Sequence, residues 1–157
     1  SKKADVFVKI YYYLFIGIIL FDQIIKRIVS LNMKAAETIP IVQNAFHITY
    51  ILNPGAAFGI LENERVFFII AGILVILAGV YILPKLKKQE KLIRFGSIFL
   101  LAGAGGNLID RIRNGLVIDF IDFRVWPVFN IADIAICSGT FFIIYSVMKS
   151  KEDKVNG

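Results

Sequence analysis

The sequence predicts an all-α polytopic membrane protein with four transmembrane helices and a small extracytoplasmic β-sheet between the first and second helices. Of its 157 residues, 57% are hydrophobic and only 19% are charged, whereas soluble domains carry about 25% charged residues. Long apolar runs alternate with short polar connections, and the basic residues gather in some of these connections and not in others. Because no internal repeat or low-complexity segment divides the chain, we expect a single membrane-embedded domain over residues 1–157.

The clearest transmembrane span covers residues 66–83, an uncharged apolar run that ends at Pro84 and a basic cluster. Such a run is long enough to cross a hydrocarbon core of about 30 Å. Three slightly more polar spans are expected at residues 8–31, 92–109 and 128–148. All four should be helical, because an isolated strand would leave its backbone groups unpaired in lipid.

The first span follows a basic N-terminus, as the apolar core of a secretory signal peptide does. However, no small-x-small cleavage site closes the span, and Asp22, Lys26 and Arg27 interrupt it. We therefore expect this segment to be retained as the first helix.

The distribution of basic residues predicts the orientation, because cytoplasmic connections are rich in Lys and Arg. The connection between the first and second spans offers only Lys34 and Arg65 against three glutamates. The connection between the second and third spans is strongly basic and is expected in the cytoplasm, as are both lysine-containing termini. Its basic residues are Lys85, Lys87, Lys88, Lys91 and Arg94.

The other two connections are expected on the outer side of the membrane. Residues 46–52 show the alternating pattern of a strand and are followed by the turn sequence Asn53-Pro54-Gly55. The sheet is therefore expected between the first and second spans. Residues 111–127 mix charged and apolar side chains, so we expect that connection to lie at the membrane interface.

Composition argues against several other functions. Nucleic-acid binding is not expected, because the net charge of +6 comes from short clusters between apolar runs. The only cysteine, Cys137, lies within an apolar run, so we expect a packed core residue and neither a disulfide framework nor a thiolate metal site. The only histidine, His47, has no cysteine near it, which argues against a zinc or di-metal centre.

Acidic side chains within the spans are candidates for function, because each costs about 2.5–3.5 kcal/mol on insertion scales. Counted from the basic residues at the inner ends of their spans, with a rise of about 1.5 Å per residue, three aspartates come to the same level, about 20–24 Å away. These aspartates are Asp22, Asp110 and Asp133, and Asp119 lies in the connection that joins two of their helices. The spacing predicts a polar site at the outer interface.

Some of these residues also have a purely structural interpretation. Asp22 and Lys26 are four residues apart and form a common stabilising pair on a helix. Asp110 and its neighbour Arg111 can form an interfacial ion pair. Asn130 is suited to cap the last helix.

The small residues 102–107 resemble a nucleotide-binding loop only superficially, because the Lys-Ser/Thr of a P-loop is missing. Small residues within a membrane helix more often permit close packing of helices. We therefore interpret this segment as a packing surface.

Asp119 and Asp133 are the best candidates for chemistry. Two carboxyl groups at one site do not both ionise easily, so one can activate a water as a base while the other, protonated, polarises a carbonyl group. The sequence offers no Ser-His pair, no reactive cysteine and no set of metal ligands. Among hydrolytic mechanisms, the residues therefore favour acid-base hydrolysis by two aspartates.

Five motifs follow one another along the chain. They are Asp22-Gln23 with Lys26, then Asn53-Pro54-Gly55-Ala56-Ala57-Phe58-Gly59, then Gly103-Ala104-Gly105-Gly106-Asn107-Leu108-Ile109-Asp110-Arg111, then Val117-Ile118-Asp119-Phe120, and finally Phe129-Asn130-Ile131-Ala132-Asp133. Together they resemble, in order and over nearly the whole chain, the motifs of the lipoprotein signal peptidase family, signal peptidase II. Ala102 departs from the pattern, since many relatives have Gly there.

The resemblance implies an intramembrane aspartyl endopeptidase of the bacterial cytoplasmic (inner) membrane. Such an enzyme cleaves the signal peptide from diacylglyceryl-modified prolipoproteins just before the lipidated cysteine, and needs no cofactor. Besides lipoprotein substrates and membrane lipids, the expected partners are globomycin-type cyclic peptide inhibitors. The resemblance implies that Asp119 and Asp133 are the catalytic pair and that other residues line or support the site: Asp22, Asn53, Gly55, Asn107, Asp110, Arg111 and Asn130.

Two other classes remain as alternatives. A small proton-coupled membrane carrier would use the membrane aspartates and Arg111 to relay ions, but it should also carry polar residues near the midplane and in the cytoplasmic half. A non-catalytic membrane chaperone or assembly subunit would tolerate exchange of Asp119 and Asp133 for asparagine.

Overall fold

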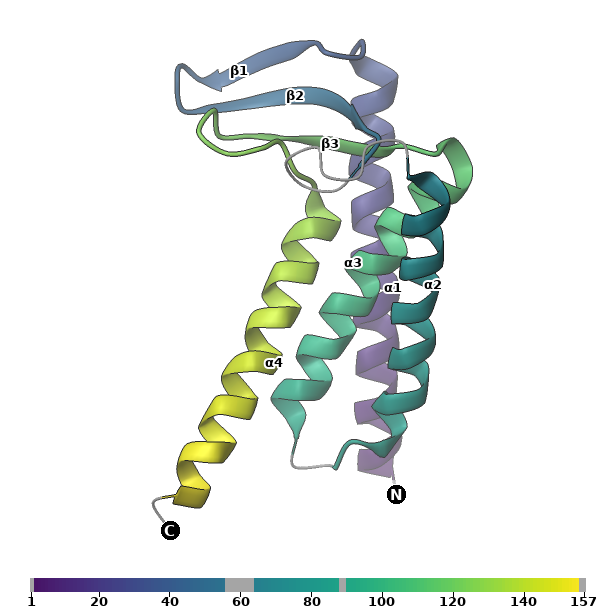
Figure 1. Ribbon diagram of the computed structural model, residues 1–157, viewed down its shortest axis with the longest axis vertical. Helices are drawn as coiled ribbons and strands as arrows, with labels where there is room; N and C mark the ends of the chain where they lie inside the picture. The colour runs from purple at the N-terminus through teal and green to yellow at the C-terminus, as the bar shows by residue number, and fades with distance from the viewer. Residues whose placement is uncertain (1, 56–63, 88–89, 156–157) are drawn as a thin grey trace.

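Four long helices stand side by side along the long axis of the molecule, with a small sheet at one end and both chain termini at the other (Figure 1). The computed structural model describes residues 2–55, 64–87 and 90–155. In chain order the elements are α1 (Lys2–Asn32), β1 (Thr38–Val42), β2 (Phe46–Asn53), α2 (Arg65–Ile82), the short 3-10 helix η2 (Leu83–Lys85), α3 (Lys91–Asn114), β3 (Val117–Asp122) and α4 (Ile131–Val155).

Three helical segments of the described chain are long and apolar enough to cross a membrane. They are Arg65–Lys85, Lys91–Asn114 and Ile131–Lys151, with mean hydropathies of 3.0, 1.5 and 1.8. The four long helices overlap the four ranges expected from sequence. The ends of α1 and α4 at the chain termini extend beyond the expected spans, since α1 begins at Lys2 and α4 ends at Val155. Two boundaries near the sheet also differ by several residues, since α3 continues past residue 109 to Asn114 and α4 begins at Ile131 and not at residue 128.

Local backbone chemistry explains both boundaries. Helix α3 ends where Gly115 adopts a left-handed conformation with φ of 78° and donates its backbone N–H to the carbonyl of Arg111, a common helix ending that favours glycine. Helix α4 begins after Asn130, whose side-chain oxygen accepts a hydrogen bond from the backbone N–H of Asp133 at 2.9 Å. The predicted capping role of Asn130 is therefore confirmed.

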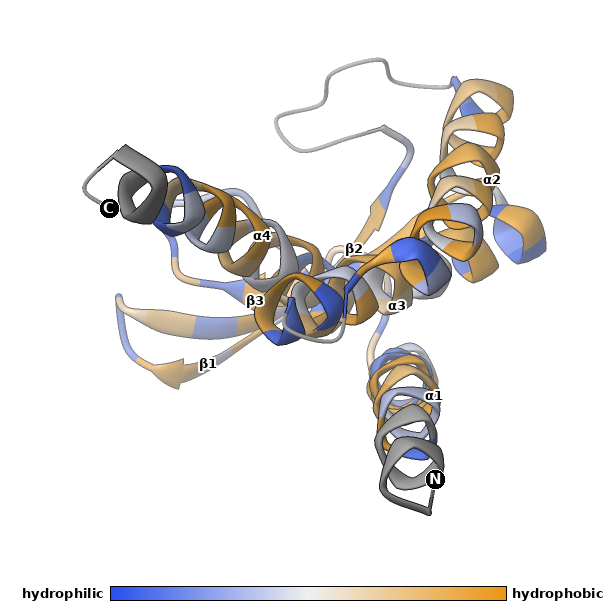
Figure 2. Cartoon of the chain, turned by 90° about the horizontal axis from the view of Figure 1, so that it is seen from below, coloured by the Kyte–Doolittle hydropathy of each residue, from blue (hydrophilic) through white to orange (hydrophobic). Residues whose placement is uncertain are grey.

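Helix α3 is central, with α1, α2 and α4 arranged around it (Figure 2). Glycines allow α3 and α4 to approach closely. A Cβ atom added at Gly103 would clash with the backbone carbonyl oxygen of Ala132, and one at Gly96 would lie 2.7 Å from the carbonyl oxygen of Gly139. The interpretation of residues 102–107 as a packing surface is confirmed.

The sheet is antiparallel, in the order β1-β2-β3. Strand β2 confirms the strand predicted at residues 46–52. Strand β3 was not predicted, because it comes from the connection between α3 and α4, and the sheet is therefore not confined to the segment between α1 and α2. Five of the six residues of β3 are buried, so the strand lacks the alternation that reveals a half-buried strand in a sequence.

Strand β3 is anchored to α1 through a small apolar core. Val29 of α1 packs with Ile118 and Phe120 of β3, and all three side chains are buried. A single bridge from Ile121 to Phe129 then leads the chain back toward the start of α4. These contacts place Asp119 directly above the first turn of α4.

Candidate active site

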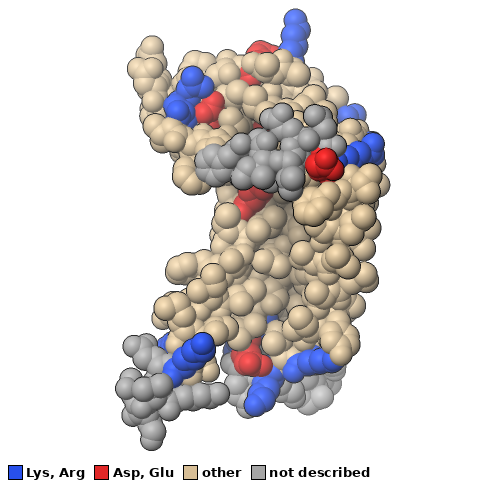
Figure 3. Space-filling model, viewed as in Figure 1, with Lys and Arg blue, Asp and Glu red and all other residues tan. Residues whose placement is uncertain are grey.

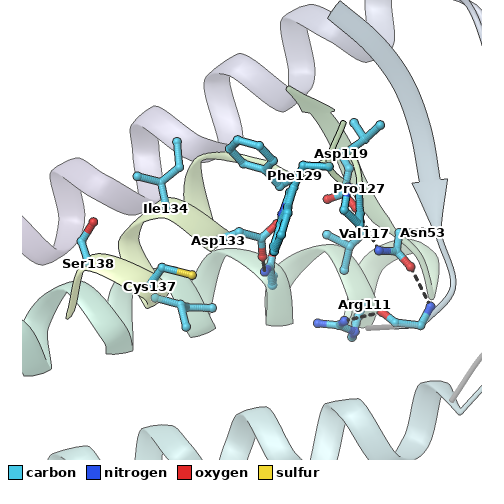
Figure 4. A pocket seen from close by; sticks show the side chains of 15 residues that line it. Asn53, Arg111, Val117, Asp119, Pro127, Phe129, Asp133, Ile134, Cys137 and Ser138 are labelled. Atoms are coloured by element: carbon cyan, nitrogen blue, oxygen red, sulfur yellow. Dashed lines mark hydrogen bonds between the residues drawn. The ribbon is translucent and has the colours of Figure 1, made fainter. Parts of the chain in front are cut away.

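Asp119 and Asp133 line the same cleft, which has a volume of about 570 Å³ (Figure 4). Asp119 belongs to β3 and is only 2% exposed, whereas Asp133 lies in the first turn of α4 and is half-buried. The structure thus brings together the two carboxyl groups that sequence analysis singled out.

Asn130 connects the two aspartates. Its side-chain amide donates to Asp119 Oδ1 at 2.8 Å, and its backbone N–H donates to Asp133 Oδ2 at 3.1 Å. Since Asn130 also accepts the backbone N–H of Asp133, the two residues cap each other in the manner of a capping box. A helix cap therefore also sets the relative position of the two carboxyl groups.

Asn107 holds the other oxygen of Asp133. Its side-chain nitrogen donates to Asp133 Oδ1 at 2.9 Å. Its side-chain oxygen accepts hydrogen bonds from Lys26 Nζ at 3.1 Å and from Asn130 Nδ2 at 3.0 Å. Asn107 therefore connects Asp133 to the buried part of α1.

The rim of the cleft is built by the turn after β2 and the end of α3. Asn53 donates to Asp119 Oδ2 at 2.9 Å and accepts the backbone N–H of Gly55. Arg111 donates to the carbonyl oxygen of Gly55 at 3.0 Å, and its guanidinium lies 4.6 Å from the centre of the Phe68 ring. Residues 56–59 of the same predicted motif lie outside the described residues.

Beneath the cleft lies a buried ion cluster. The Lys26 ammonium lies 2.9 Å from both Asp22 Oδ2 and Asp110 Oδ2. The predicted Asp22–Lys26 pair is therefore confirmed. In contrast, the expected ion pair of Asp110 with Arg111 is wrong, because α3 turns the Asp110 carboxylate toward α1 while Arg111 points to the cleft.

The two carboxylates of the cluster also bind backbone groups of neighbouring elements. Asp22 Oδ1 accepts the backbone N–H of Ala132 at 2.9 Å, at the free N-terminal end of α4. Asp110 Oδ2 accepts the backbone N–H of Ile118 in β3 at 3.1 Å. The cluster thus connects α1 and α3, which supply its side chains, with β3 and α4, which carry Asp119 and Asp133.

Sequence analysis missed the central position of Lys26 and the role of Gln23. The Gln23 side chain donates to Asp110 Oδ1 at 2.9 Å and to the carbonyl oxygen of Gly106 at 3.1 Å. The sequence pattern that could have predicted both is a polar Asp-Gln pair followed one turn later by a lysine inside an otherwise apolar span. Each such polar group needs a partner in lipid, so this pattern indicates that the three side chains contact polar groups of another helix.

Burial has a strong effect on the Asp119 carboxyl group. Loss of hydration, together with the nearby charge of Asp133, raises the pKa of Asp119 from 3.8 to about 7, although hydrogen bonds from Asn53 and Asn130 act in the opposite direction. Asp119 therefore retains its proton at higher pH than an ordinary aspartate does. Asp133 accepts hydrogen bonds from two N–H donors, the Asn107 side chain and the Asn130 backbone.

The remaining walls of the cleft are mostly apolar and include Trp126, Val128, Ile134 and Ile136. Cys137 also lines the cleft and is exposed, so the prediction of a packed core residue is wrong. In the apolar run of α4 the composition does not distinguish the face that packs on α3 from the face that borders the cleft. Within the described residues, no three His, Cys, Asp or Glu side chains are grouped to hold a metal ion.

This fold and site define a class of protein, a membrane enzyme with two aspartates at a cleft between apolar helices and a small sheet. The family model described as Signal peptidase (SPase) II matches residues 14–149. The chain belongs to the signal peptidase II family. It is therefore an aspartic-type peptidase that removes signal peptides from prolipoproteins, which argues against the carrier and the assembly subunit.

Relatives and solved structures agree with this membership. The lipoprotein signal peptidase of Clostridioides difficile is 44% identical over 141 residues, covering 88% of this chain and 95% of the relative. That of Pelotomaculum thermopropionicum is 42% identical over 136 residues, covering 86% and 89%. A bacterial membrane enzyme solved by the in meso method superposes with a TM-score of 0.90 at 34% identity, covering 94% of this chain and 93% of that one.

Proposed function

We propose that Asp119 and Asp133 are the catalytic pair and that they hydrolyse the peptide bond just before the diacylglyceryl-modified cysteine of prolipoproteins. The observation that carries this proposal is the placement of two carboxyl groups in different environments at one cleft. Asp119 is buried and retains its proton at higher pH than an ordinary carboxyl group, whereas Asp133 accepts two N–H hydrogen bonds.

These environments assign different roles to the two residues. The Asp133 carboxylate takes a proton from a water molecule, and the water oxygen attacks the carbonyl carbon of the scissile bond. The Asp119 carboxyl group donates its proton to the carbonyl oxygen as negative charge develops there. When the tetrahedral intermediate collapses, the C–N bond breaks, Asp119 recovers its proton, and the leaving nitrogen takes the proton held by Asp133.

The residues around the pair hold the enzyme and the substrate in position. Asn53 and Asn130 fix the two oxygens of Asp119 through their side-chain amides. Arg111 uses one of its five N–H donors on Gly55, and we assign the others to carbonyl groups of the substrate backbone. Asn107 lines the cleft and holds Asp133, whereas Asp22 and Asp110 act from below the cleft.

The apolar walls of the cleft suit a lipid-modified substrate. Ile134, Ile136 and Trp126 border the same space as the two aspartates. A signal peptide and the acyl chains of the modified cysteine can contact these walls without leaving the bilayer. Globomycin-type cyclic peptides are expected to bind in the same cleft and to compete with the substrate.

The four long helices, α1 included, are proposed to span the bacterial cytoplasmic membrane with both termini in the cytoplasm. Figure 3 shows charged side chains gathered toward the two ends and a broad band of uncharged ones between them. Lys85, Lys87 and Arg94 lie at the end opposite the sheet, and Lys149 and Lys151 lie near the C-terminus at the same end. The positive-inside rule places that end in the cytoplasm and the sheet outside.

Cleavage of a diacylglyceryl-modified prolipoprotein by the purified protein in detergent tests the catalytic pair. Asp119→Asn and Asp133→Asn are each expected to lower kcat by more than about 1,000-fold, because each removes a group that transfers a proton during the reaction. Asp122→Asn is the matched control, since Asp122 lies in the same strand but binds Thr49 and Arg124 outside the cleft.

Thermal melting establishes that each variant is folded. The proposal holds if both cleft variants fold and lose cleavage while the Asp122→Asn enzyme remains active. Substantial cleavage by folded Asp119→Asn or Asp133→Asn enzyme would show that the reaction does not depend on this pair.

A further inference from the structure

We propose that Lys26 is a positioning residue for the reaction and acts on Asp133 through the side chain of Asn107. The inference rests on the proposed catalytic role of Asp133. Lys26 makes no hydrogen bond to Asp119 or Asp133. Its charge lowers the pKa of Asp119 through space, whereas a hydrogen-bonded path from Lys26 to Asp133 has to pass through an intermediate group. The described hydrogen bonds identify this group as the Asn107 amide.

The Lys26 ammonium has a complete and well-defined set of acceptors. The side chain is 2% exposed, and its nitrogen lies 2.9 Å from Asp22 Oδ2, 2.9 Å from Asp110 Oδ2 and 3.1 Å from Asn107 Oδ1. An ammonium group has three N–H donors, so each donor has one oxygen. Two of these oxygens belong to carboxylates of opposite charge, and the third belongs to the neutral Asn107.

This third contact determines which way the Asn107 amide points. With Lys26 and Asn130 both donating to its oxygen, the Asn107 nitrogen faces Asp133. If the amide rotated by half a turn, its N–H₂ group would meet the Lys26 ammonium and its oxygen would meet the Asp133 carboxylate. Both contacts would be repulsive, so Lys26 holds the amide in the orientation that donates to Asp133.

The consequence concerns the state of the base. Asp133 accepts one hydrogen bond from Asn107 and one from the Asn130 backbone. Without Lys26, the Asn107 amide loses the charged donor that fixes it, and Asp133 loses a firmly held N–H partner. A carboxylate with fewer donors binds a proton more readily, so in a variant without Lys26 less of Asp133 is in the charged form that takes a proton from water, and the reaction slows even where the fold is kept.

A double-mutant cycle with Lys26→Met and Asn107→Ala tests this pathway, with kcat measured between pH 5 and pH 9. Lys26→Met is expected to lower kcat by at least about tenfold, as for loss of a charged hydrogen bond, and to move the acidic limb of the pH profile to higher pH. Because both residues act through one contact, the double variant should lose no more than Asn107→Ala alone. Thr49→Val, which removes a buried hydrogen bond to Asp122 in the sheet, controls for loss of stability and should leave the pH profile unchanged.

Removing Lys26 leaves two buried carboxylates unpaired, which can prevent folding. In that case the cycle starts from the Lys26→Met, Asp22→Asn, Asp110→Asn variant, in which no buried charge of the cluster is left unpaired, and adding Asn107→Ala should cost little further activity. Losses that multiply in the cycle, or an unchanged pH profile, would overturn the positioning role while leaving the proposed function intact. The proposed function itself fails only if the Asp119→Asn or Asp133→Asn enzyme cleaves.

Discussion

At the scale of single residues, burial of the Asp119 carboxyl group couples proton binding to folding. Burial and the charge of Asp133 raise its pKa to about 7, so the folded chain binds this proton more tightly than the unfolded chain does. The contribution of this group to stability is therefore fully present below pH 4 or so and is lost as the pH rises through about 7. An ordinary salt-bridged aspartate shows the opposite dependence.

This coupling predicts a stability difference between the wild-type protein and Asp119→Asn that depends on pH. From about pH 4 to pH 7 and above, the wild type should lose up to about 4 kcal/mol relative to the variant. Thermal melting of both proteins in the same detergent across this range measures the difference, and groups distant from Asp119 that titrate in both proteins cancel. Parallel curves would show that Asp119 has an ordinary pKa in the folded protein.

At the scale of secondary-structure elements, the site depends on close contact between α3 and α4. Asn107 lies on α3 and Asp133 lies on α4, and the hydrogen bond between them requires the two helices to approach closely. Gly103 permits this approach, because any side chain there would meet the backbone of α4. In lipid such packing is a main source of association between helices.

Gly103→Ala is therefore expected to destabilise the protein by about 1–3 kcal/mol, as for other overpacked sites. Gly17→Ala is the matched control, because Gly17 lies in α1 and a Cβ atom there would meet nothing within 4 Å. That substitution should change stability by less than about 1 kcal/mol, in the stabilising direction. Equal melting temperatures for the two variants would contradict the close contact of α3 with α4.

At the scale of the whole molecule, the position of the site relative to the membrane is the main consequence of the fold. The sheet caps one end of the helices, and the aspartates lie where the sheet meets them (Figures 1 and 4). A signal peptide that crosses the membrane presents its cleavage site near the outer face. The proposed orientation therefore brings enzyme and substrate to the same depth.

Labelling of single cysteines in intact cells tests this orientation. Gln43 and Lys87 are both exposed and lie at opposite ends of the molecule, and Cys137→Ser removes the only native thiol. A membrane-impermeant maleimide should label Gln43→Cys from outside and should label Lys87→Cys only after the cells are permeabilised. The reverse pattern would place both termini outside.

The long helices, strand β2 and the two aspartates that share the cleft could all be predicted from the sequence. Each depends on local features: the length of an apolar run, the alternation of residues 46–52, and the cost of an acidic group near lipid. These features persist whatever the helices pack against. The catalytic assignment of Asp119 and Asp133 remains a proposal.

Three features could not be predicted from the sequence: the third strand, the exposure of Cys137 and the position of Lys26 at the centre of the ion cluster. Strand β3 is recognisable only beside β2, and Cys137 is exposed because its face of α4 borders the cleft and does not pack on α3. Lys26 pairs with Asp110, which is 84 positions away in the sequence. Each depends on contacts between segments far apart in the chain, for which local composition and periodicity contain no information.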